Sequence, residues 1–178
     1  MTGTNGKGSV SSLVAFLLDR AGLAPSFAIG AKLLDYGTNA RTAAGLHLVA
    51  ELDESDGSFA NTRPDVLIVN NLEADHLNYY RDLDGLLDHF VRYLSSDAAP
   101  PVVVANGDDP NVRVVLERSG CRAVSFGCSQ GCTYRLSDVA LRGFGASFEL
   151  AGPAGDLGRF ELNLPGEHNA MNAAAALA

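Results

Sequence analysis

The chain has 178 residues, 47% of them hydrophobic, and a formal net charge of −8. This length and composition fit one globular domain and exclude a disordered chain. The negative charge argues against nucleic-acid binding through bulk electrostatics. The sequence contains neither a run long enough to span a bilayer nor the apolar core of a signal peptide. We therefore expect a cytoplasmic protein without a nucleic-acid or membrane partner.

The first residues form a glycine-rich turn that ends in a lysine, Gly3-Thr4-Asn5-Gly6-Lys7. Glycines allow successive backbone N–H groups to point at phosphate oxygens, and the next helix adds its positive N-terminal end. This pattern predicts a phosphate-binding loop (P-loop), and the alternative is an ordinary flexible N-terminus. Such loops commonly have Ser or Thr directly after the lysine as a Mg²⁺ ligand, whereas Gly8 stands there in this chain. The first hydroxyl is that of Ser9, which we predict as the replacement ligand.

The middle of the chain alternates between strand and helix patterns. Apolar residues recur at helical spacing in three segments, residues 10–21, 83–94 and 110–117. Four largely apolar runs predict strands, at residues 26–30, 46–50, 66–69 and 101–105. Residues 36–41 are polar and turn-rich, which predicts a loop with room for a substrate. The alternation predicts an α/β fold with a mostly parallel sheet flanked by helices.

The C-terminal third has a different character. Its short, partly alternating runs are separated by glycine-rich turns, at residues 123–126, 133–136, 146–150 and 159–164. We expect the first to join the main sheet and the others to form a small antiparallel β unit. Residues 137–145 are predicted to be a flexible bend. An alanine-rich helical run then closes the chain.

Polar residues follow two of the predicted strands. An acidic run, Glu51, Asp53, Glu54 and Asp56, follows the strand at 46–50. The strand at 66–69 is followed by Asn70, Asn71, Glu73, Asp75 and His76. Ligands of open α/β sheets lie outside the carboxyl ends of the strands, so we expect both groups and the P-loop to converge on one crevice.

With these motifs in order, the chain resembles the central ATPase domain of the Mur ligases, the ATP-dependent amide-forming enzymes of peptidoglycan synthesis. The resemblance rests on four segments, Gly3-Thr4-Asn5-Gly6-Lys7, Glu51-Leu52-Asp53-Glu54-Ser55-Asp56, Asn71-Leu72-Glu73-Ala74-Asp75-His76 and Gly166-Glu167-His168-Asn169-Ala170-Met171-Asn172. It implies that residues 1–178 are a single domain from a three-domain protein. The N-terminal UDP-sugar domain and the C-terminal domain would then lie outside this chain.

Within the family, the chain is most similar to the branch that joins L-alanine to UDP-N-acetylmuramate. Asp-Glu-Ser-Asp at 53–56 and the segment Glu73–Tyr80 carry this similarity. Phe90 stands about where other branches have a carbamylated lysine, which the L-alanine-adding branch lacks. The sequence Lys7-Gly8-Ser9 is instead similar to folylpolyglutamate synthetase, and a tripeptide-recycling ligase shares most motifs. These two ligases are the alternatives, and a nucleotide-binding fragment without activity is the non-enzyme alternative.

The resemblance implies an ADP-forming ligase that uses ATP and Mg²⁺, with UDP-N-acetylmuramate and an amino acid as substrates. The isolated domain is not expected to catalyse the full reaction. The catalytic residues implied are Lys7, Glu51 and His76, and the metal ligands Ser9, Glu51 and His76. Nucleotide contacts are implied for Gly3, Thr4, Asn5, Gly6, Lys7, Gly8, Ser9, Asn71, His168, Asn169 and Asn172. Sugar-nucleotide contacts are implied for Asn39 and Arg41.

Some of these residues also have a simpler interpretation. Asp53, Glu54 and Asp56 would then form a solvated acidic face. His76 would be a strand-end histidine that bonds to Asp75, because imidazole prefers softer metals than Mg²⁺. Asn169 would act as a helix N-cap.

Overall fold

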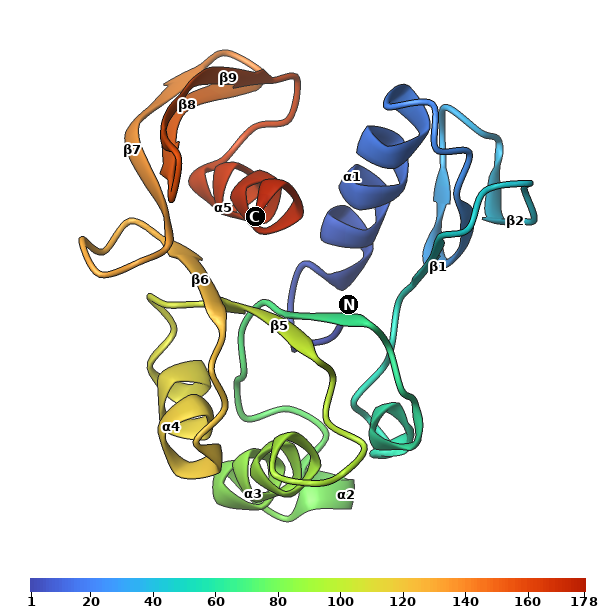
Figure 1. The fold of residues 1–178 in the computed structure, drawn as a ribbon, viewed down its shortest axis with the longest axis vertical. Coiled ribbons are helices and arrows are strands. Elements are labelled where there is room, and N and C mark those ends of the chain that lie inside the picture. Colours follow the sequence, from blue (N-terminus) through green and yellow to red (C-terminus); the bar gives the residue numbers. More distant parts are fainter.

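The computed structural model describes residues 1–178 and contains two β-sheets and five α-helices (Figure 1). The larger sheet has the order β4-β5-β6-β7-β8-β9 and the smaller one the order β2-β1-β3. The strands of the larger sheet are β4 (Val66–Val69), β5 (Val102–Asn106), β6 (Val124–Gly127), β7 (Tyr134–Arg142), β8 (Gly145–Gly152) and β9 (Gly155–Leu162). Those of the smaller sheet are β1 (Ser26–Leu33), β2 (Thr38–Arg41) and β3 (Leu48–Ala50).

The helices are α1 (Lys7–Arg20), α2 (Leu77–Tyr80), α3 (Leu83–Leu94), α4 (Pro110–Ser119) and α5 (Glu167–Leu177), with a 3₁₀ turn η1 at Ser58–Asn61. Figure 1 shows α1 and α5 on one side of β5, with α3 and α4 on the other. Successive side chains of a strand point to opposite faces, so Val103 packs with the α3 side and Val104 with the α5 side. No helix has the length and apolar composition that a membrane span requires.

The larger sheet confirms the predicted α/β fold. Strands β4 to β7 pair in parallel, with Leu67 opposite Val103 at the centre of the first pair. Strands β7, β8 and β9 then pair antiparallel. The small antiparallel unit is therefore an extension of the main sheet, because β7 belongs to both parts.

Three expectations about local structure were wrong. The strands predicted at 26–30 and 46–50 form a separate sheet and do not lie beside 66–69. Residues 36–41 contain the edge strand β2, which pairs antiparallel with β1 despite its polar sequence. Residues 137–145 are not a flexible bend, since β7 continues to Arg142 and pairs with β8 across a tight turn.

The first two residues connect the two sheets. The Met1 amino group donates to the Ala50 carbonyl at 3.0 Å, and the Leu52 amide donates to the Met1 carbonyl at 2.8 Å. On the other side, the Thr2 amide donates to the Ile68 carbonyl at 2.9 Å. Met1 and Thr2 thus lie between β3 and β4. This position brings the glycine-rich turn to the carboxyl ends of both strands.

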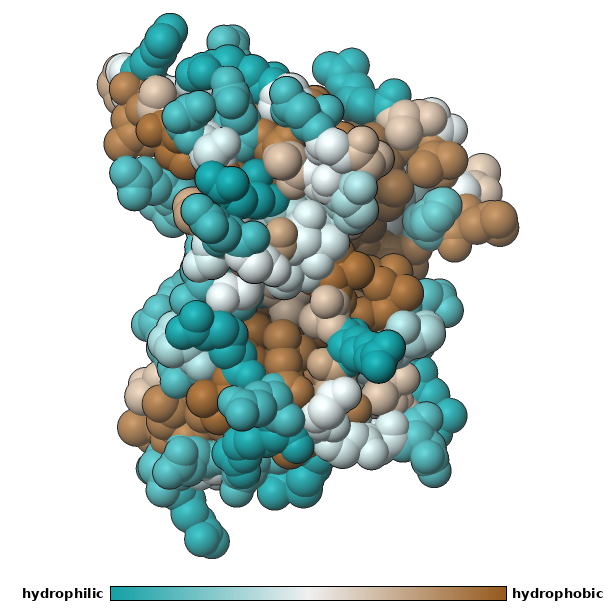
Figure 2. Space-filling model, turned by 60° about the vertical axis from the view of Figure 1, so that its left-hand side comes forward, coloured by the Kyte–Doolittle hydropathy of each residue, from teal (hydrophilic) through white to brown (hydrophobic).

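Two apolar clusters hold the layers of the larger sheet together, and a third packs α1 on β1 and β3. One packs α3 and α4 on β4 and β5 and includes Phe59 and Phe90, whose rings stack with centroids 4.4 Å apart. The other packs α1 and α5 on β5 to β8 and includes Phe126 and Phe148. In Figure 2 apolar residues lie in patches between hydrophilic ones, and both kinds reach the outline of the molecule.

Candidate functional site

The turn Gly3–Gly6 followed by Lys7, the first residue of α1, has the backbone geometry of a P-loop. Gly3 and Gly6 have φ angles of +123° and +81°, which L side chains rarely adopt. A Cβ atom on Gly3 would lie 2.8 Å from the backbone oxygen of Asn71. No side chain caps the N-terminus of α1. Its first N–H groups can therefore donate to an anion, and the helix dipole favours one there.

Asparagine side chains fasten this loop to β4 and α5. The Asn5 amide donates to Asn71 Oδ1 at 2.7 Å, and Asn71 Nδ2 donates back to the Asn5 carbonyl at 3.0 Å. Asn70 Nδ2 donates both to the Asn5 carbonyl and to Oδ1 of the buried Asn172, at 2.9 and 3.0 Å. The predicted nucleotide residues Asn71 and Asn172 thus already bond within the protein, which fixes the shape of the loop.

Two cavities flank the loop. The first, which we name the acidic cavity, has a volume of about 600 Å³. Its lining includes Thr4, Lys7, Gly30, Asn39, Glu51, Asp53, Asp75 and His76. The second, the asparagine cavity, has a volume of about 660 Å³. Its lining includes Asn5, Gly6, Ser9, Asn71, Leu136, Val139, His168, Asn169, Met171 and Asn172. The carboxyl ends of β3 and β4 therefore meet at the P-loop, but the polar residues that follow them line two cavities and not the one crevice that was expected.

Lys7 lines the acidic cavity and forms an ion pair with the buried carboxylate of Glu54, which is not part of the cavity lining. Its Nζ lies 3.0 and 3.3 Å from the two carboxylate oxygens of Glu54 and 3.3 Å from the Thr4 carbonyl. The Glu54 side chain is only 1% exposed, and its Oε1 lies 3.7 Å from His76 Nε2. The Tyr80 hydroxyl donates to the Glu54 carbonyl oxygen and fixes the backbone there.

This arrangement corrects one interpretation of the acidic run. Asp53 and Asp56 are exposed, as a solvated face requires, whereas Glu54 is buried. Nothing in the local sequence distinguishes Glu54 from its acidic neighbours. Its burial follows from distant contacts with Lys7, His76 and Tyr80, which adjacent residues do not reveal.

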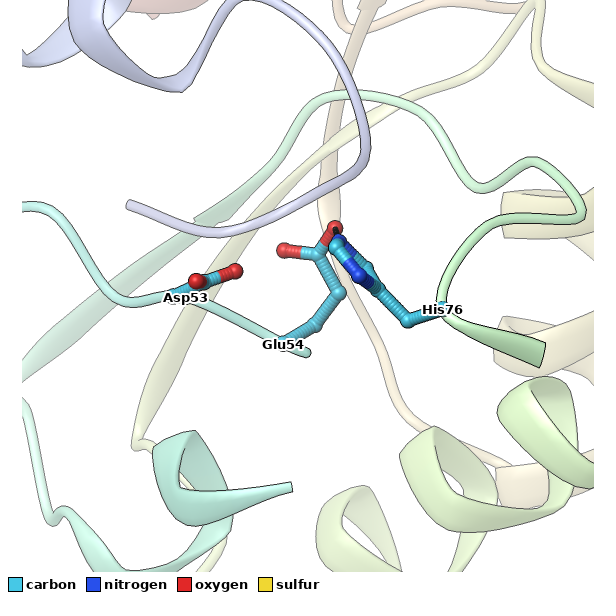
Figure 3. A group of neighbouring side chains, drawn as sticks. All are labelled: Asp53, Glu54 and His76. Atoms are coloured by element: carbon cyan, nitrogen blue, oxygen red, sulfur yellow. Dashed lines mark ion pairs between the residues drawn. The ribbon is translucent and has the colours of Figure 1, made fainter. Parts of the chain in front are cut away.

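Three side chains beside the P-loop, two of which line the acidic cavity, offer donors suited to a divalent cation. Ligand atoms of Asp53, Glu54 and His76 lie within 4.8 Å of one another, and the Glu54 carboxylate lies between the other two (Figure 3). Burial alone would raise the pKa of Asp53, but hydrogen bonds from the Ser55 hydroxyl and amide, with Lys7 nearby, lower it overall. Carboxylate oxygens are the ligands that Mg²⁺ prefers, and imidazole is less usual. The donor set therefore fits Mg²⁺ mainly through its carboxylates.

The three predicted metal ligands are not all brought together. Glu51 and His76 line the acidic cavity, and Glu51 Oε2 accepts from the Gly30 amide at 2.7 Å. Ser9 is exposed and lines the asparagine cavity instead. Gly8, on the first turn of α1, lies close to Glu51, because a Cβ atom placed on it would lie 3.5 Å from Glu51 Oε2. The metal role of Ser9 stays a prediction.

The predicted nucleotide-binding residues of the C-terminal segment lie together in the asparagine cavity. His168, Asn169 and Asn172 line it beside the apolar side chains of Leu136 and Met171. Asn169 Nδ2 donates to the Pro165 carbonyl at 2.7 Å. Helix α5 begins after Gly166 without a side-chain cap, so the N-cap interpretation of Asn169 was wrong. A flat base that offers donors and acceptors would find both apolar surface and amide groups here.

The two predicted sugar-nucleotide residues lie apart. Asn39 lines the acidic cavity. Arg41 does not line it, because its guanidinium bonds to Asp19 at 2.8 Å and stacks over the rings of Phe27 and Tyr36. In this position Arg41 holds β2 against α1.

The glycine-rich turn, the helix it begins and the sheet behind it define an α/β domain of the P-loop class. A sequence model described as the Mur ligase middle domain matches residues 1–178. The chain therefore belongs to the Mur ligase family, as its middle domain.

Two sequence relatives carry the same name. The UDP-N-acetylmuramate–L-alanine ligase of Geobacter sp. (strain M21) is 40% identical over 178 residues, which cover 100% of this chain and 39% of that protein. The ligase of the same name from Arthrobacter sp. (strain FB24) is 42% identical over 184 residues and 38% of its length. The chain thus spans about two fifths of the length of these relatives.

Solved structures give the same family. UDP-N-acetylmuramate-alanine ligase from Thermotoga maritima has a TM-score of 0.81 at 26% identity, over 98% of this chain and 39% of that one. The UDP-N-acetylmuramate:L-alanyl-gamma-D-glutamyl-meso-diaminopimelate ligase from Neisseria meningitides has a TM-score of 0.83 at 30% identity, over 98% and 58%. The predicted family and fold are confirmed.

Proposed function

We propose that this chain is the ATP- and Mg²⁺-binding part of an ADP-forming ligase that joins L-alanine to UDP-N-acetylmuramate through an acyl phosphate. The observation that carries the proposal is the position of the P-loop between two different cavities. On one side Lys7 faces Glu51, Asp53, Glu54 and His76. On the other side the His168–Asn172 segment forms an amide-rich cavity with apolar walls. A triphosphate suits the first cavity and a base suits the second.

The protein groups account for binding and charge neutralisation. Loop N–H groups and Lys7 would hold the phosphates, while Glu51, Asp53, Glu54 and His76 would hold Mg²⁺. When bound, Mg²⁺ neutralises the charge that develops as the terminal phosphoryl group is transferred. In the overall reaction a substrate carboxylate takes that phosphoryl group, an amine attacks the acyl phosphate, and phosphate leaves. The domain contributes mainly positioning and electrostatic stabilisation.

The relatives favour L-alanine over the alternative substrates. Both sequence relatives described above are named as L-alanine ligases. The tripeptide-recycling alternative keeps support from the Neisseria meningitides structure, whose name specifies such a substrate. The folylpolyglutamate synthetase alternative gains no support beyond the Lys7-Gly8-Ser9 similarity, because the structures of that kind are 15–16% identical and share the fold alone. We therefore propose L-alanine as the amino acid, with the tripeptide as the second candidate.

Calorimetric titration of the chain with ATP and with GTP, each with Mg²⁺, tests the nucleotide assignment. We expect ATP to bind more tightly than GTP, by about tenfold or more, the scale of one or two hydrogen bonds. Guanine-binding loops normally carry a lysine in an Asn-Lys-x-Asp segment, and this chain has lysine only at positions 7 and 32. A preference for GTP would reject the ligase and favour a P-loop switch protein.

A further inference from the structure

Lys7 has no free donor in the structure. A lysine ammonium has three N–H groups, and Lys7 Nζ has three acceptors, the Thr4 carbonyl and the two carboxylate oxygens of Glu54. A phosphate oxygen that binds this ammonium must therefore displace at least part of the Glu54 pair. The carboxylate of Glu54 and the ligand phosphate compete for the same cation.

The Glu54 side chain is shielded from solvent where it contacts Lys7. It is 1% exposed, and the Tyr80 hydroxyl holds the Glu54 backbone carbonyl. The groups that remain beside it are His76, 3.7 Å from Oε1, and the carboxylate of Asp53. A buried carboxylate without a counter-charge is strongly unfavourable, and a second carboxylate nearby adds repulsion. A divalent cation between these groups would replace the charge of Lys7.

We propose that Glu54 is a positioning residue that competes with phosphate for Lys7 and thereby makes nucleotide binding depend on a divalent cation. In the absence of nucleotide, Glu54 holds the Lys7 ammonium at the mouth of the loop. When phosphate takes Lys7, the Glu54 carboxylate becomes a cation ligand with Asp53 and His76. This inference rests on the proposed binding of ATP and assigns a role to a residue that the local sequence did not single out.

The test is the ATP affinity of Glu54→Gln, measured by titration with Mg²⁺ and with a chelator. Glutamine keeps the volume and one acceptor oxygen but removes the charge that competes for Lys7. We expect ATP binding without metal to tighten by about tenfold, the scale of one charge-assisted hydrogen bond. With Mg²⁺ the affinity should stay equal or fall, so the ratio of the two dissociation constants shrinks. Equal weakening under both conditions indicates only a structural role and would overturn the proposal.

Glu73→Gln is the matched control. Glu73 is exposed and also lies at the loop, where it accepts from Asn5 Nδ2 at 3.2 Å, but it makes no ion pair with Lys7. The control removes the same negative charge from the protein. If the contact with Lys7 matters, and not the overall charge, Glu73→Gln should change the ATP affinity by less than about twofold. An equal effect of Glu73→Gln and Glu54→Gln would overturn the proposal.

Two further measurements keep the result interpretable. Thermal unfolding shows whether each variant is folded. If Glu54→Gln is not, Glu54→Asp withdraws the carboxylate from Lys7 by one methylene and should produce the same change to a smaller extent. If the wild type binds ATP and the folded variants keep the same metal dependence, this inference is rejected and the proposed function stands. Failure of the wild type to bind ATP under both conditions rejects the proposed function and this inference with it.

Discussion

Replacing Lys7 by alanine is expected to weaken ATP binding by about a hundredfold, the equivalent of one strong charge-assisted contact. Lys7 is the only cationic side chain of the loop and lies at the start of α1, beside the acidic cavity. The same change leaves Glu54 buried without its partner, which should cost on the order of 3 kcal/mol of stability. Equilibrium titration with Mg²⁺ and ATP, together with chemical denaturation, measures both effects.

Lys32→Ala is the control for this prediction, because Lys32 is the only other lysine and its side chain is exposed on β1. Lys32→Ala should change neither the ATP affinity nor the stability appreciably. The double variant Lys7→Ala with Glu54→Gln should recover most of the lost stability but not the ATP affinity. Unchanged ATP affinity in the folded Lys7→Ala variant would contradict the P-loop assignment.

Replacing Gly3 by alanine should destabilise the whole domain, by on the order of 3 kcal/mol. Gly3 has a φ of +123°, and a Cβ atom there would lie 2.8 Å from the Asn71 carbonyl oxygen and 3.1 Å from the Asn70 nitrogen. Both neighbours are backbone atoms at the end of β4, so neither can move without breaking the bonds that hold the loop. ATP binding should weaken as well. Chemical denaturation and ATP titration of the variant measure the two losses.

Gly22→Ala separates strain from steric clash. Gly22 has a φ of +77°, but no atom lies within 4 Å of a Cβ placed on it. The left-handed conformation alone should therefore lower the stability of this variant, by about 1 kcal/mol. Equal losses for Gly3→Ala and Gly22→Ala would show that the contact of Gly3 with β4 is unimportant.

Elements with a strong local signal were predicted from the sequence within a residue or two. The apolar run Val66–Val69 is β4, and the helical spacing from Leu83 to Leu94 is α3. The separation of β1 and β3 into a second sheet was not predictable in this way. This separation depends on Met1 and Thr2, which lie between β3 and β4 and bond to residues about 50 and 66 positions further along the chain. Polar β2 is likewise a strand through its pairing with β1, and Arg41 at its end also bonds to the distant Asp19 on α1.

The residues of the candidate site also fall into two groups, those that belong to a local sequence pattern and those whose position depends on distant contacts. Gly6, Glu51, His76 and His168 line the two cavities, and the sequence could single them out because each belongs to a local pattern with a chemical meaning. Glu54 was not distinguished from the exposed acids beside it, since its burial comes from contacts with distant elements. The neighbourhood of Ser9 was also not predictable. The direction of a side chain on the first turn of α1 depends on how the helix packs against β1 and α5.

ADP release by the full-length ligase tests the proposed function most directly. The reaction would be measured with ATP, Mg²⁺ and UDP-N-acetylmuramate, against L-alanine, the tripeptide and other amino acids. We expect ADP release that requires UDP-N-acetylmuramate, is fastest with L-alanine and is lost in the Lys7→Ala variant. ADP release with none of these acceptors, or release that persists without Lys7, would contradict the proposed function.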